Sequence, residues 1–363
     1  QSVIVPSGAT ELPLDRMEPP VSRLTDTDVN LEAAPEAPPS WRMADPMIQL
    51  FTSGTAGEPK LVQLTVGNLL ASAGASAVRL GVTPSDDWLD CLPIFHMGGL
   101  APVIRSTLYG TTLTVHEGFD PVAIGESIVD RSITGISLVP TQLHRLLEAG
   151  AALDTLRVVL LGGAPASPSL IDRCEDLAIP VYPTYGLTET ASQVTTATPD
   201  EAGRIPGRGG RPLVGKTETL VEGDGEPRDD GAEGEIVVSG PTVTPGYVND
   251  PDATVFGQHG LHTGDIGYLT DGRLWVTGRM SDVILTGGEQ VFPREVSEVI
   301  LDHPAVDAAA VVGLDDPDWG ERIAALVVGE AVSGTALEAF TRERLAGFKV
   351  PKTWAFTDEL PRT

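Results

Sequence analysis

Short apolar runs alternate with amphipathic stretches along the chain between residue 47 and about residue 200. The apolar runs have the length of strands and lie at residues 47–51, 88–92, 112–115, 135–139, 158–161 and 180–182. The stretches that predict helices lie at 68–72 and at about 121–131, 141–149 and 168–177, the last three entered through Pro, Thr or Ser. This alternation predicts an α/β fold with mostly parallel sheet and crossover helices.

The pattern changes after residue 205. Short strands punctuated by Gly and Pro, at 218–221, 234–238 and 272–276, predict a compact β region attached to the α/β body. Beyond Arg279, a small α+β domain is predicted from a helix at about 293–303, strands at 308–312 and 323–328, and a helix near 336–346. Near the start, the sequence predicts a short strand at 2–5 and an exposed connection at 25–40.

The chain carries 51 Asp and Glu residues against 24 Lys and Arg residues, a formal net charge of -27 over 363 residues. This balance argues against nucleic acid and against an anionic membrane surface as partners. Because the acidic residues are spread along the whole chain, we hypothesise a halophilic source, where salt screens their mutual repulsion.

The apolar segments and the cysteines of the chain bear on its cellular location. No apolar run reaches the roughly 18 residues that cross a bilayer, and no charged-then-apolar leader opens the chain. We therefore expect a soluble, cytoplasmic protein without membrane insertion. The two cysteines, Cys91 and Cys174, have no CxxC spacing, which predicts reduced, structural thiols.

A loop of small, hydroxylated and glycine residues, closed by a lysine, follows the first strand of the α/β pattern. Its glycines let backbone N–H groups approach an anion, its hydroxyls add donors, and Lys60 supplies positive charge. A position between a strand and a helix is where α/β folds usually bind ligands. The sequence thus predicts a phosphate site with the candidate residues Thr52, Ser53, Gly54, Thr55, Gly57 and Lys60.

Two other loops follow strands in the same way. Gly162–Pro165 follows the run at 158–161, and its glycines let the backbone approach a planar ligand. Tyr185–Thr190 follows the run at 180–182 and offers an aromatic ring for stacking, hydroxyls for phosphate and a carboxylate for Mg²⁺.

A fourth pattern resembles a phosphate-binding motif but lacks the structural context that the motif requires. Gly210–Thr217 matches the Walker motif G-x-x-x-x-G-K-[ST] letter for letter. A Walker loop must open a helix, whereas residues 218–221 read as a strand. We therefore do not expect Lys216 to bind phosphate.

The order of the motifs is more specific than any one of them. The chain resembles the adenylate-forming superfamily of acyl-CoA synthetases, luciferases and nonribosomal adenylation domains from about residue 47 to residue 363. The resemblance is carried by Thr52–Lys60, Tyr185–Thr190, Gly246-Tyr247, His262–Asp265 and Thr277–Arg279, in that order. It implies a large domain at residues 1–280 that binds ATP and the acyl substrate, and a mobile C-terminal lid domain at residues 281–363.

The resemblance also implies roles around the nucleotide. The loop at Ser53–Lys60 would clamp the phosphates, Gly162–Pro165 and Tyr185 would frame adenine, and Thr188 and Glu189 would contact the α-phosphate and Mg²⁺. Asp265 and Arg279 would hold the ribose hydroxyls, in agreement with their chemistry, since a carboxylate accepts hydrogen bonds and an arginine only donates them. The nucleotide-binding residues expected on this basis are Thr52, Ser53, Gly54, Thr55, Gly57, Lys60, Gly163, Ala164, Pro165, Tyr185, Gly186, Thr188, Asp265 and Arg279.

The acyl substrate is suggested by two segments. Leu92–Leu100 looks like the family segment whose histidine, here His96, borders the acyl pocket. Glu189–Gln193 is similar to the o-succinylbenzoate-CoA ligase branch of menaquinone biosynthesis. In that branch His96 and Gln193 would donate hydrogen bonds around an aromatic dicarboxylate, with Arg105 as a further ion partner. The substrate residues implied are His96, Gly186, Leu187, Ser192 and Gln193.

The small domain resembles the superfamily's lid. Gly287, Gly288 and Glu289 match the loop beside the CoA pantetheine, and Trp319-Gly320-Glu321 matches a second lid motif. The hinge would fall at Ser281, where many members carry aspartate or lysine instead. Family members also carry a lysine a few residues past Thr363 and well over a hundred residues before the phosphate loop, so we expect further segments beyond both ends of this sequence.

We therefore expect an AMP-forming acid–thiol ligase that uses ATP, Mg²⁺ and CoA to convert o-succinylbenzoate to o-succinylbenzoyl-CoA. The catalytic residues would be Lys60, His96, Thr188 and Glu189, with Glu189 holding the metal. The expected partners are small molecules, and the sequence leaves open whether the chain forms a homo-oligomer. The alternatives are another aryl- or acyl-CoA ligase, a non-catalytic nucleotide-binding protein, and a Walker-type NTPase that depends on Lys216 rather than Lys60.

Overall fold

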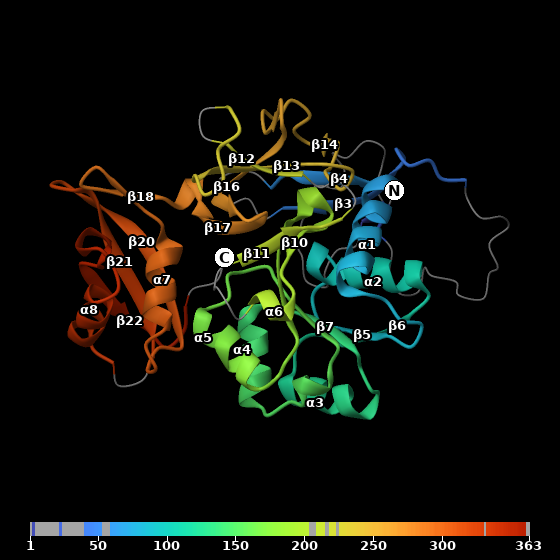
Figure 1. The fold of residues 1–363 in the computed structure, drawn as a ribbon, viewed down its shortest axis with the longest axis horizontal. Helices are drawn as coiled ribbons and strands as arrows, with labels where there is room; N and C mark the ends of the chain where they lie inside the picture. The colour runs from blue at the N-terminus through green and yellow to red at the C-terminus, as the bar shows by residue number, and fades with distance from the viewer. Residues whose placement is uncertain are drawn as a thin grey trace.

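The computed structural model describes residues 40–52, 59–202, 208–214, 218–222, 225–329 and 332–360, with 208–209 and 218–222 as backbone only. It also describes the backbone of two short strands, β1 (Ser2–Val3) and β2 (Ser22–Arg23), which pair in parallel. The rest of the predicted strand at 2–5, and the connection at 25–40 except residue 40, lie outside the described residues. Figure 1 shows a large body with a smaller domain beside it.

The α/β part of the body is a run of parallel strands in the order β6-β5-β7-β8-β9. These strands are β5 (Asp87–Asp90), β6 (Thr112–Val115), β7 (Gly135–Leu138), β8 (Val158–Leu161) and β9 (Val181–Leu187). Each crossover contains one helix, in chain order α2 (Met97–Tyr109), α3 (Pro121–Asp130), α4 (Pro140–Glu148) and α5 (Pro168–Asp176). The predicted parallel α/β fold is confirmed.

Local sequence explains where these helices begin. Proline opens α3, α4 and α5, at the position where its missing N–H would have no helical partner anyway. The Asp120 side chain accepts hydrogen bonds from the first backbone N–H groups of α3, and Ser167 caps α5 in the same way.

The two faces of the parallel strands are covered by different helices. Helices α3, α4 and α5 bury their apolar side chains, such as Ile128, Leu146 and Cys174, against one face. On the other face, Leu80 of α1 (Val66–Leu80) packs against Val158 and Leu160 of β8. Both cysteines are buried free thiols, and burial raises the pKa of Cys91 to about 12 and that of Cys174 to about 11. Burial thus disfavours the thiolate form of both side chains, in keeping with structural thiols.

The compact β region is continuous with the parallel strands rather than separate from them. β10 (Ser192–Thr196) pairs antiparallel with β9 and with β11 (Arg208–Pro212), and the sheet continues to a total of 12 strands. The added strands are β17 (Arg273–Arg279), β16 (Gly260–Thr270), β13 (Gly234–Ser239), β12 (Glu218–Glu222) and β15 (Phe256–Gly257). This arrangement is visible across the top of the body in Figure 1.

The Walker-like pattern falls within this antiparallel region. Gly210 lies in β11, between β10 and β17, and the next element of the chain is the strand β12. Lys216 lies outside the described residues. Because a strand follows where a Walker loop requires a helix, the rejection of this motif from sequence agrees with the structure.

A small sheet beside the body contains the two strands that flank the predicted phosphate loop. It contains β3 (Pro46–Phe51), β4 (Leu61–Thr65) and β14 (Gly246–Tyr247) in the order β14-β4-β3, all antiparallel. The loop therefore joins two strands of a hairpin: the sequence placed it between a strand and a helix, and β4, which lies between the loop and that helix, was not predicted. Helix α1 begins only after β4, where Thr65 and Asn68 form a capping box.

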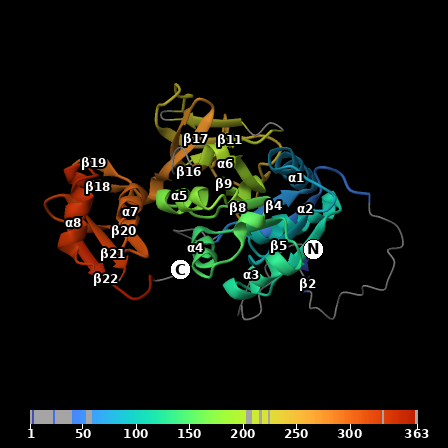
Figure 2. The same ribbon diagram turned by 60° about the horizontal axis from the view of Figure 1, so that its bottom comes forward.

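The C-terminal domain has a core of its own. Its sheet consists of β18 (Ile284–Thr286), β19 (Glu289–Val291), β20 (Ala308–Asp316), β21 (Gly320–Val328) and β22 (Thr353–Phe356). Helices α7 (Pro293–Leu301) and α8 (Gly334–Arg342) pack on it through residues such as Val296, Ile300 and Leu337. Figure 2 shows this domain lying to one side of the body from a second direction. The predicted α+β character is confirmed, with the hairpin β18–β19 and strand β22 added.

Within the part of the chain that the structure describes, no helix combines the length and apolarity needed to cross a bilayer.

Candidate active site

Three side chains form a hydrogen-bonded cluster on β9, β16 and β17. Asp265 of β16 lies directly opposite Arg279 of β17, and Arg279 Nε donates to Asp265 Oδ1 over 2.8 Å. Tyr185 of β9 donates its hydroxyl to Asp265 Oδ2 over 2.7 Å, although the two residues are 80 positions apart. Burial, reinforced by the charge of Asp265, raises the pKa of Tyr185 well above its usual range, so the hydroxyl stays a neutral donor.

Asp265 projects from an irregularity in β16. The register between β13 and β16 shifts next to Glu235, and residues 263–265 bulge out of the ladder. Glu235 fixes the bulge from β13, since its Oε1 accepts the Gly264 N–H over 3.0 Å and its Oε2 lies 2.7 Å from His262 Nδ1. The Thr263 hydroxyl then accepts the Asp265 N–H over 3.1 Å. The sequence motif His262–Asp265 is therefore a bulge in β16, from which the Asp265 carboxylate projects.

The predicted phosphate loop is described at its two ends. Thr52 N donates to the Lys60 carbonyl over 2.9 Å, which closes the hairpin of β3 and β4. Lys60 Nζ lies 3.2 Å from Asp250 Oδ2 and 4.8 Å from the centre of the Tyr247 ring. The remaining candidates, Ser53, Gly54, Thr55 and Gly57, lie outside the described residues.

Tyr247 links Lys60 to Glu189, the predicted metal ligand. Thr188 and Glu189 lie in η4 (Thr188–Thr190), a single 3-10 turn directly after β9. The Tyr247 hydroxyl donates to Glu189 Oε1 over 2.9 Å, while the Tyr247 ring lies beneath the ammonium of Lys60. Burial, together with the charge of Glu189, raises the pKa of Tyr247 well above its usual range, so it also acts as a neutral donor.

The donor set around Glu189 fits Mg²⁺ better than a transition metal. Among the residues that the structure describes, no group of three or more His, Cys, Asp or Glu side chains is placed to hold a metal ion. Magnesium typically binds proteins through one or two carboxylates and takes its remaining ligands from substrate phosphates and water. Glu189 supplies a single carboxylate and is linked through Tyr247 to Lys60, the predicted phosphate-binding residue, so it meets that requirement.

The predicted adenine loop lies at the same sheet edge as Tyr185. Gly163, Ala164 and Pro165 follow β8 after Gly162 and are exposed. Since β8 and β9 run parallel and in register, the ends of both strands point to one edge. Gly163 has a φ of 77°, a value that favours glycine, which lets the loop turn sharply there.

Ser192 and Gln193 face the end of β9 across a tight antiparallel pair. Gly186 pairs with Gln193, and Leu187 pairs with Ser192. A Cβ at Gly186 would collide with the Ser192 carbonyl oxygen, so this close approach requires glycine. Gln193 itself is 2% exposed, and its amide nitrogen donates to Thr196 over 2.7 Å.

Arg105 reaches the same strand from helix α2. Its Nη2 donates to Ser192 Oγ over 3.1 Å, its side chain is buried, and burial lowers its pKa to about 10. Arg105 Nε has no hydrogen-bond partner among the described residues. A buried guanidinium without a carboxylate partner is costly unless an anion completes it, so Arg105 and Ser192 are suited to bind a carboxylate.

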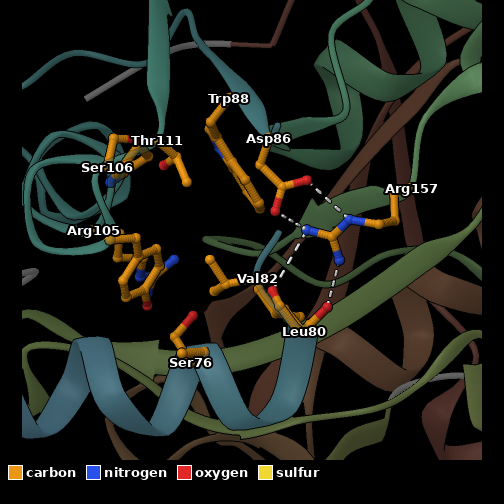
Figure 3. Close-up of a pocket in the computed structure, with 13 residues that line it drawn as sticks. Ser76, Leu80, Val82, Asp86, Trp88, Arg105, Ser106, Thr111 and Arg157 are labelled. Carbon is orange, nitrogen blue, oxygen red and sulfur yellow. Dashed lines mark hydrogen bonds and ion pairs between the residues drawn. The ribbon is translucent and has the colours of Figure 1, made fainter. Parts of the chain in front are cut away.

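Arg105 also lines a pocket between α1, α2 and β5 (Figure 3). The pocket is bordered by Trp88 and by the ion pair of Asp86 with Arg157, whose closest atoms are 2.7 Å apart. Figure 3 shows this ion pair on the side of the pocket away from Arg105. The Asp86 carboxylate thus accepts hydrogen bonds from Arg157 rather than from Arg105. The Arg157 guanidinium also donates to the Leu80 carbonyl.

His96 is exposed rather than buried. It is the residue before helix α2, and its ring contacts the ring of Phe95 at a centroid distance of 4.6 Å. Because His96 is exposed, its ring nitrogens are accessible to a ligand. His96 precedes α2, the helix that carries Arg105.

In the small domain the two lid motifs touch each other. Gly287 and Gly288 form the two-residue turn between β18 and β19, and both have positive φ, at 60° and 85°. Gly287 N donates to the Trp319 carbonyl over 2.8 Å, and a side chain on Gly287 would clash with the Trp319 ring. Glu289 follows in β19 and is exposed. The predicted CoA loop is therefore a rigid hairpin braced by an exposed tryptophan.

The hinge candidate Ser281 lies between the two domains in η5 (Met280–Asp282) and is exposed. Its hydroxyl donates to Asp282 over 2.8 Å. Beyond Ser281, Arg294 of α7 donates to the Val276 carbonyl of β17 over 2.7 Å, a contact between the small domain and the body.

Sequence reasoning assigned no role to Asn249 or Asp250, and it noted Tyr247 only as part of an ordered motif. The structure brings all three to Lys60 because β14 pairs with β4, the strand that Lys60 immediately precedes. A strand of two residues has no readable periodicity, so the position of Gly246-Tyr247 in the motif order was the one available signal.

Comparison with known proteins gives a consistent result. The family model described as AMP-binding enzyme matches residues 4–248, and that described as AMP-binding enzyme C-terminal domain matches residues 295–363. The chain is 44% identical over 329 residues to a 2-succinylbenzoate–CoA ligase of Bacillus mycoides, covering 89% of this chain and 68% of that protein. It is 45% identical over 322 residues to a protein of the same name from Geobacillus kaustophilus, covering 86% and 66%.

Solved structures agree. The o-succinylbenzoate CoA synthetase (MenE) of Bacillus subtilis in complex with the acyl-adenylate intermediate OSB-AMP superposes with a TM-score of 0.84 at 40% identity, covering 89% of this chain and 67% of that one. The same enzyme in complex with ATP and magnesium ion gives a TM-score of 0.86 at 39% identity, covering 94% and 73%. The chain therefore belongs to the AMP-binding enzyme family, with the adenylate-forming fold of a large α/β domain and a small C-terminal domain.

Proposed function

We propose that this protein is an ATP-dependent acid–thiol ligase that joins 2-succinylbenzoate to CoA through an acyl-adenylate. The observation that carries the proposal is the placement of Tyr185, Asp265 and Arg279, suited to a nucleoside, on the same sheet as Ser192. Ser192 accepts a hydrogen bond from Arg105 of helix α2, and this pair is suited to a carboxylate. The similarity to 2-succinylbenzoate–CoA ligases over most of the chain supports the choice of acid.

In the first step a substrate carboxylate oxygen attacks the α-phosphorus of ATP, and the bond to the pyrophosphate oxygen breaks. Asp265 and Arg279 hold the ribose hydroxyls, and Tyr185 with Gly163, Ala164 and Pro165 frames the adenine. Lys60 stabilises the negative charge that grows on the leaving pyrophosphate, together with Thr52 and the loop residues Ser53, Gly54, Thr55 and Gly57.

Glu189 would hold Mg²⁺, which would neutralise phosphate charge when bound. Thr188 donates its hydroxyl to the α-phosphate beside it. The hydrogen bond from Tyr247 fixes the orientation of the Glu189 carboxylate before the nucleotide arrives.

The acyl substrate lies along the end of β9, next to Gly186 and Leu187. Arg105 and Ser192 bind the carboxylate that does not react, and His96 borders the pocket from the start of α2. Gln193, next to Ser192 in β10, is buried, and its amide nitrogen donates to Thr196.

In the second step the CoA thiolate attacks the acyl carbonyl carbon, and AMP leaves with the electron pair of the broken bond. We propose that the lid, residues 281–363, turns about Ser281 to bring the hairpin of Gly287, Gly288 and Glu289 beside the pantetheine. Residues 1–280 hold both other substrates.

The test is pyrophosphate release with a panel of acids, followed by mass spectrometry of the acyl-CoA product. We expect 2-succinylbenzoate to give the largest kcat/KM and Arg105→Met to raise its KM about tenfold or more, as loss of a charged hydrogen bond predicts. A strong response to a fatty or benzoic acid without any to 2-succinylbenzoate would assign another acyl- or aryl-CoA ligase. ATP binding without acyl-adenylate from any acid would assign a non-catalytic nucleotide-binding protein.

We further propose a halophilic, cytoplasmic setting. The formal net charge of -27 supports it, because self-repulsion of that size is relieved by screening in a salt-rich cytoplasm. Unfolding at low salt with recovery in molar KCl is the expected result, and stability that is indifferent to salt would refute it.

A further inference from the structure

The side chain of Asn249 binds the backbone on both sides of Lys60. Its Nδ2 donates to the Pro59 carbonyl over 2.8 Å, and its Oδ1 accepts the Leu61 N–H over 2.7 Å. One side chain thus satisfies the peptide groups that precede and follow the lysine. Next to it, Val248 N donates to the Leu61 carbonyl over 2.8 Å, which continues the pairing of β14 with β4.

The same segment also fixes Glu189. The Tyr247 hydroxyl donates to the Glu189 carboxylate over 2.9 Å, and Thr244 N donates to the Glu189 carbonyl over 2.7 Å. Residues 244–250 therefore hold both the proposed phosphate-binding lysine and the proposed metal ligand. Because these hydrogen bonds all come from one short stretch of chain, that stretch sets the distance between Lys60 and Glu189.

Asp250 adds a charge to this arrangement. Its Oδ2 lies 3.2 Å from Lys60 Nζ, and the two side chains keep 44% and 37% of their surface exposed. The ammonium also lies over the Tyr247 ring, at 4.8 Å from its centre. In this structure the lysine is therefore already paired with an anion of the protein.

We propose that residues 244–250 act as a bracket in which Asn249 positions Lys60, and in which Asp250 is a counter-ion that pyrophosphate must displace. This inference rests on the proposed role of Lys60 in binding phosphate. Asn249 and Asp250 are positioning residues, since they act through Lys60 rather than on the nucleotide itself.

The two residues have opposite effects on ligand binding. Asn249 holds the lysine backbone in place for the ligand, whereas Asp250 competes with the ligand for the lysine charge. An exposed ion pair contributes about 0.2–1 kcal/mol, so the competition by Asp250 corresponds to about 1.5- to 5-fold in affinity. Because the pair is exposed, salt screens it.

The first experiment measures the dissociation constant of Mg-pyrophosphate for Asp250→Asn by calorimetry. We expect binding to tighten about 1.5- to 5-fold at the lowest KCl concentration at which the protein stays folded, and the gain to shrink as KCl is raised further. Glu148→Gln is the matched control, because Glu148 forms an exposed ion pair with Arg173 at 2.9 Å in a different part of the body. Unchanged or weaker binding by Asp250→Asn would refute the role as a competing counter-ion.

The second experiment is a double-mutant cycle on pyrophosphate release. Asn249→Ala should lower kcat/KM for ATP about tenfold in the wild-type background, since two backbone hydrogen bonds are lost, and less than about twofold in the Lys60→Ala background. Equal losses in both backgrounds would mean that Asn249 only supports the fold. If the wild type binds Mg-pyrophosphate but releases none from any acid, the proposed ligase function fails, and the calorimetric cycle with the same variants still decides the inference.

Discussion

Asp90, the last residue of β5, is a buried carboxyl without a charged partner. It is 1% exposed, its Oδ1 accepts the Leu92 N–H over 3.2 Å, and its Oδ2 has no hydrogen-bond partner within the described residues. Burial raises the pKa of Asp90 to about 7 from an ordinary value of 3.8, and the bond from Leu92 opposes this only in part.

The sign of the pH effect follows from the protons bound. Between about pH 4 and pH 7 the folded chain keeps the Asp90 proton while the unfolded chain has lost it. The free energy of unfolding therefore falls as the pH rises through this window, and levels off above it. At 1.36 kcal/mol for each unit between 3.8 and about 7, the contribution is at most about 4 kcal/mol.

The substitution Asp90→Asn removes the titratable carboxyl group but keeps the size and shape of the side chain. Below about pH 5 we expect the variant to be less stable than the wild type by about 1–3 kcal/mol, because its amide leaves a buried donor unpaired. Above about pH 8 the wild type has an unpaired buried charge, so the order should reverse by a similar amount.

The assay is urea unfolding of both proteins at several pH values between about 5 and 9, at fixed salt. Asp130→Asn, at an exposed position at the end of α3, is the control and should shift nothing between these limits. A stability difference between Asp90→Asn and the wild type that is constant over the whole range would refute the reasoning.

Two further predictions concern the site. Gly186→Ala should destabilise the protein by about 1–3 kcal/mol, because its Cβ would collide with the Ser192 carbonyl, whereas Gly74→Ala, in helix α1 with open space around it, should stabilise it by about 0.5–1 kcal/mol. Thermal unfolding compares the two, and equal shifts would contradict the packing argument. Tyr185→Phe should raise the KM for ATP about tenfold, because Asp265, 5% exposed, loses a hydrogen bond of 2.7 Å. An unchanged ATP KM would mean that Asp265 does not need this donor.

Local sequence determined much of the fold. The runs at 112–115 and 158–161 became β6 and β8 with the same bounds, because short apolar stretches between capped helices leave few other structures open. The helices α3, α4 and α5 begin at Pro121, Pro140 and Pro168, within one residue of the predicted starts. The motif order indicated the AMP-binding enzyme family, which the comparisons confirmed.

Other elements could not be read from local pattern. β16, with 11 residues, is interrupted by the bulge that carries Asp265, so its period is broken where its function lies. Helix α2 contains Pro102 and two early glycines, which argue against a helix unless packing stabilises it. β4 is short, and its presence turned the expected strand–loop–helix into a hairpin.

Local sequence was enough to identify the reactive side chains of this protein: a lysine after a glycine-rich loop, a carboxylate after a tyrosine, an aspartate and an arginine. Which partner each of these side chains contacts depends on how distant segments pack. Lys60 meets Asp250 and Tyr247, and Arg105 meets Ser192, across long separations in the chain. Those contacts come from the pairing of β14 with β4 and from the packing of α2 on β10, and neither leaves a periodic trace in the sequence.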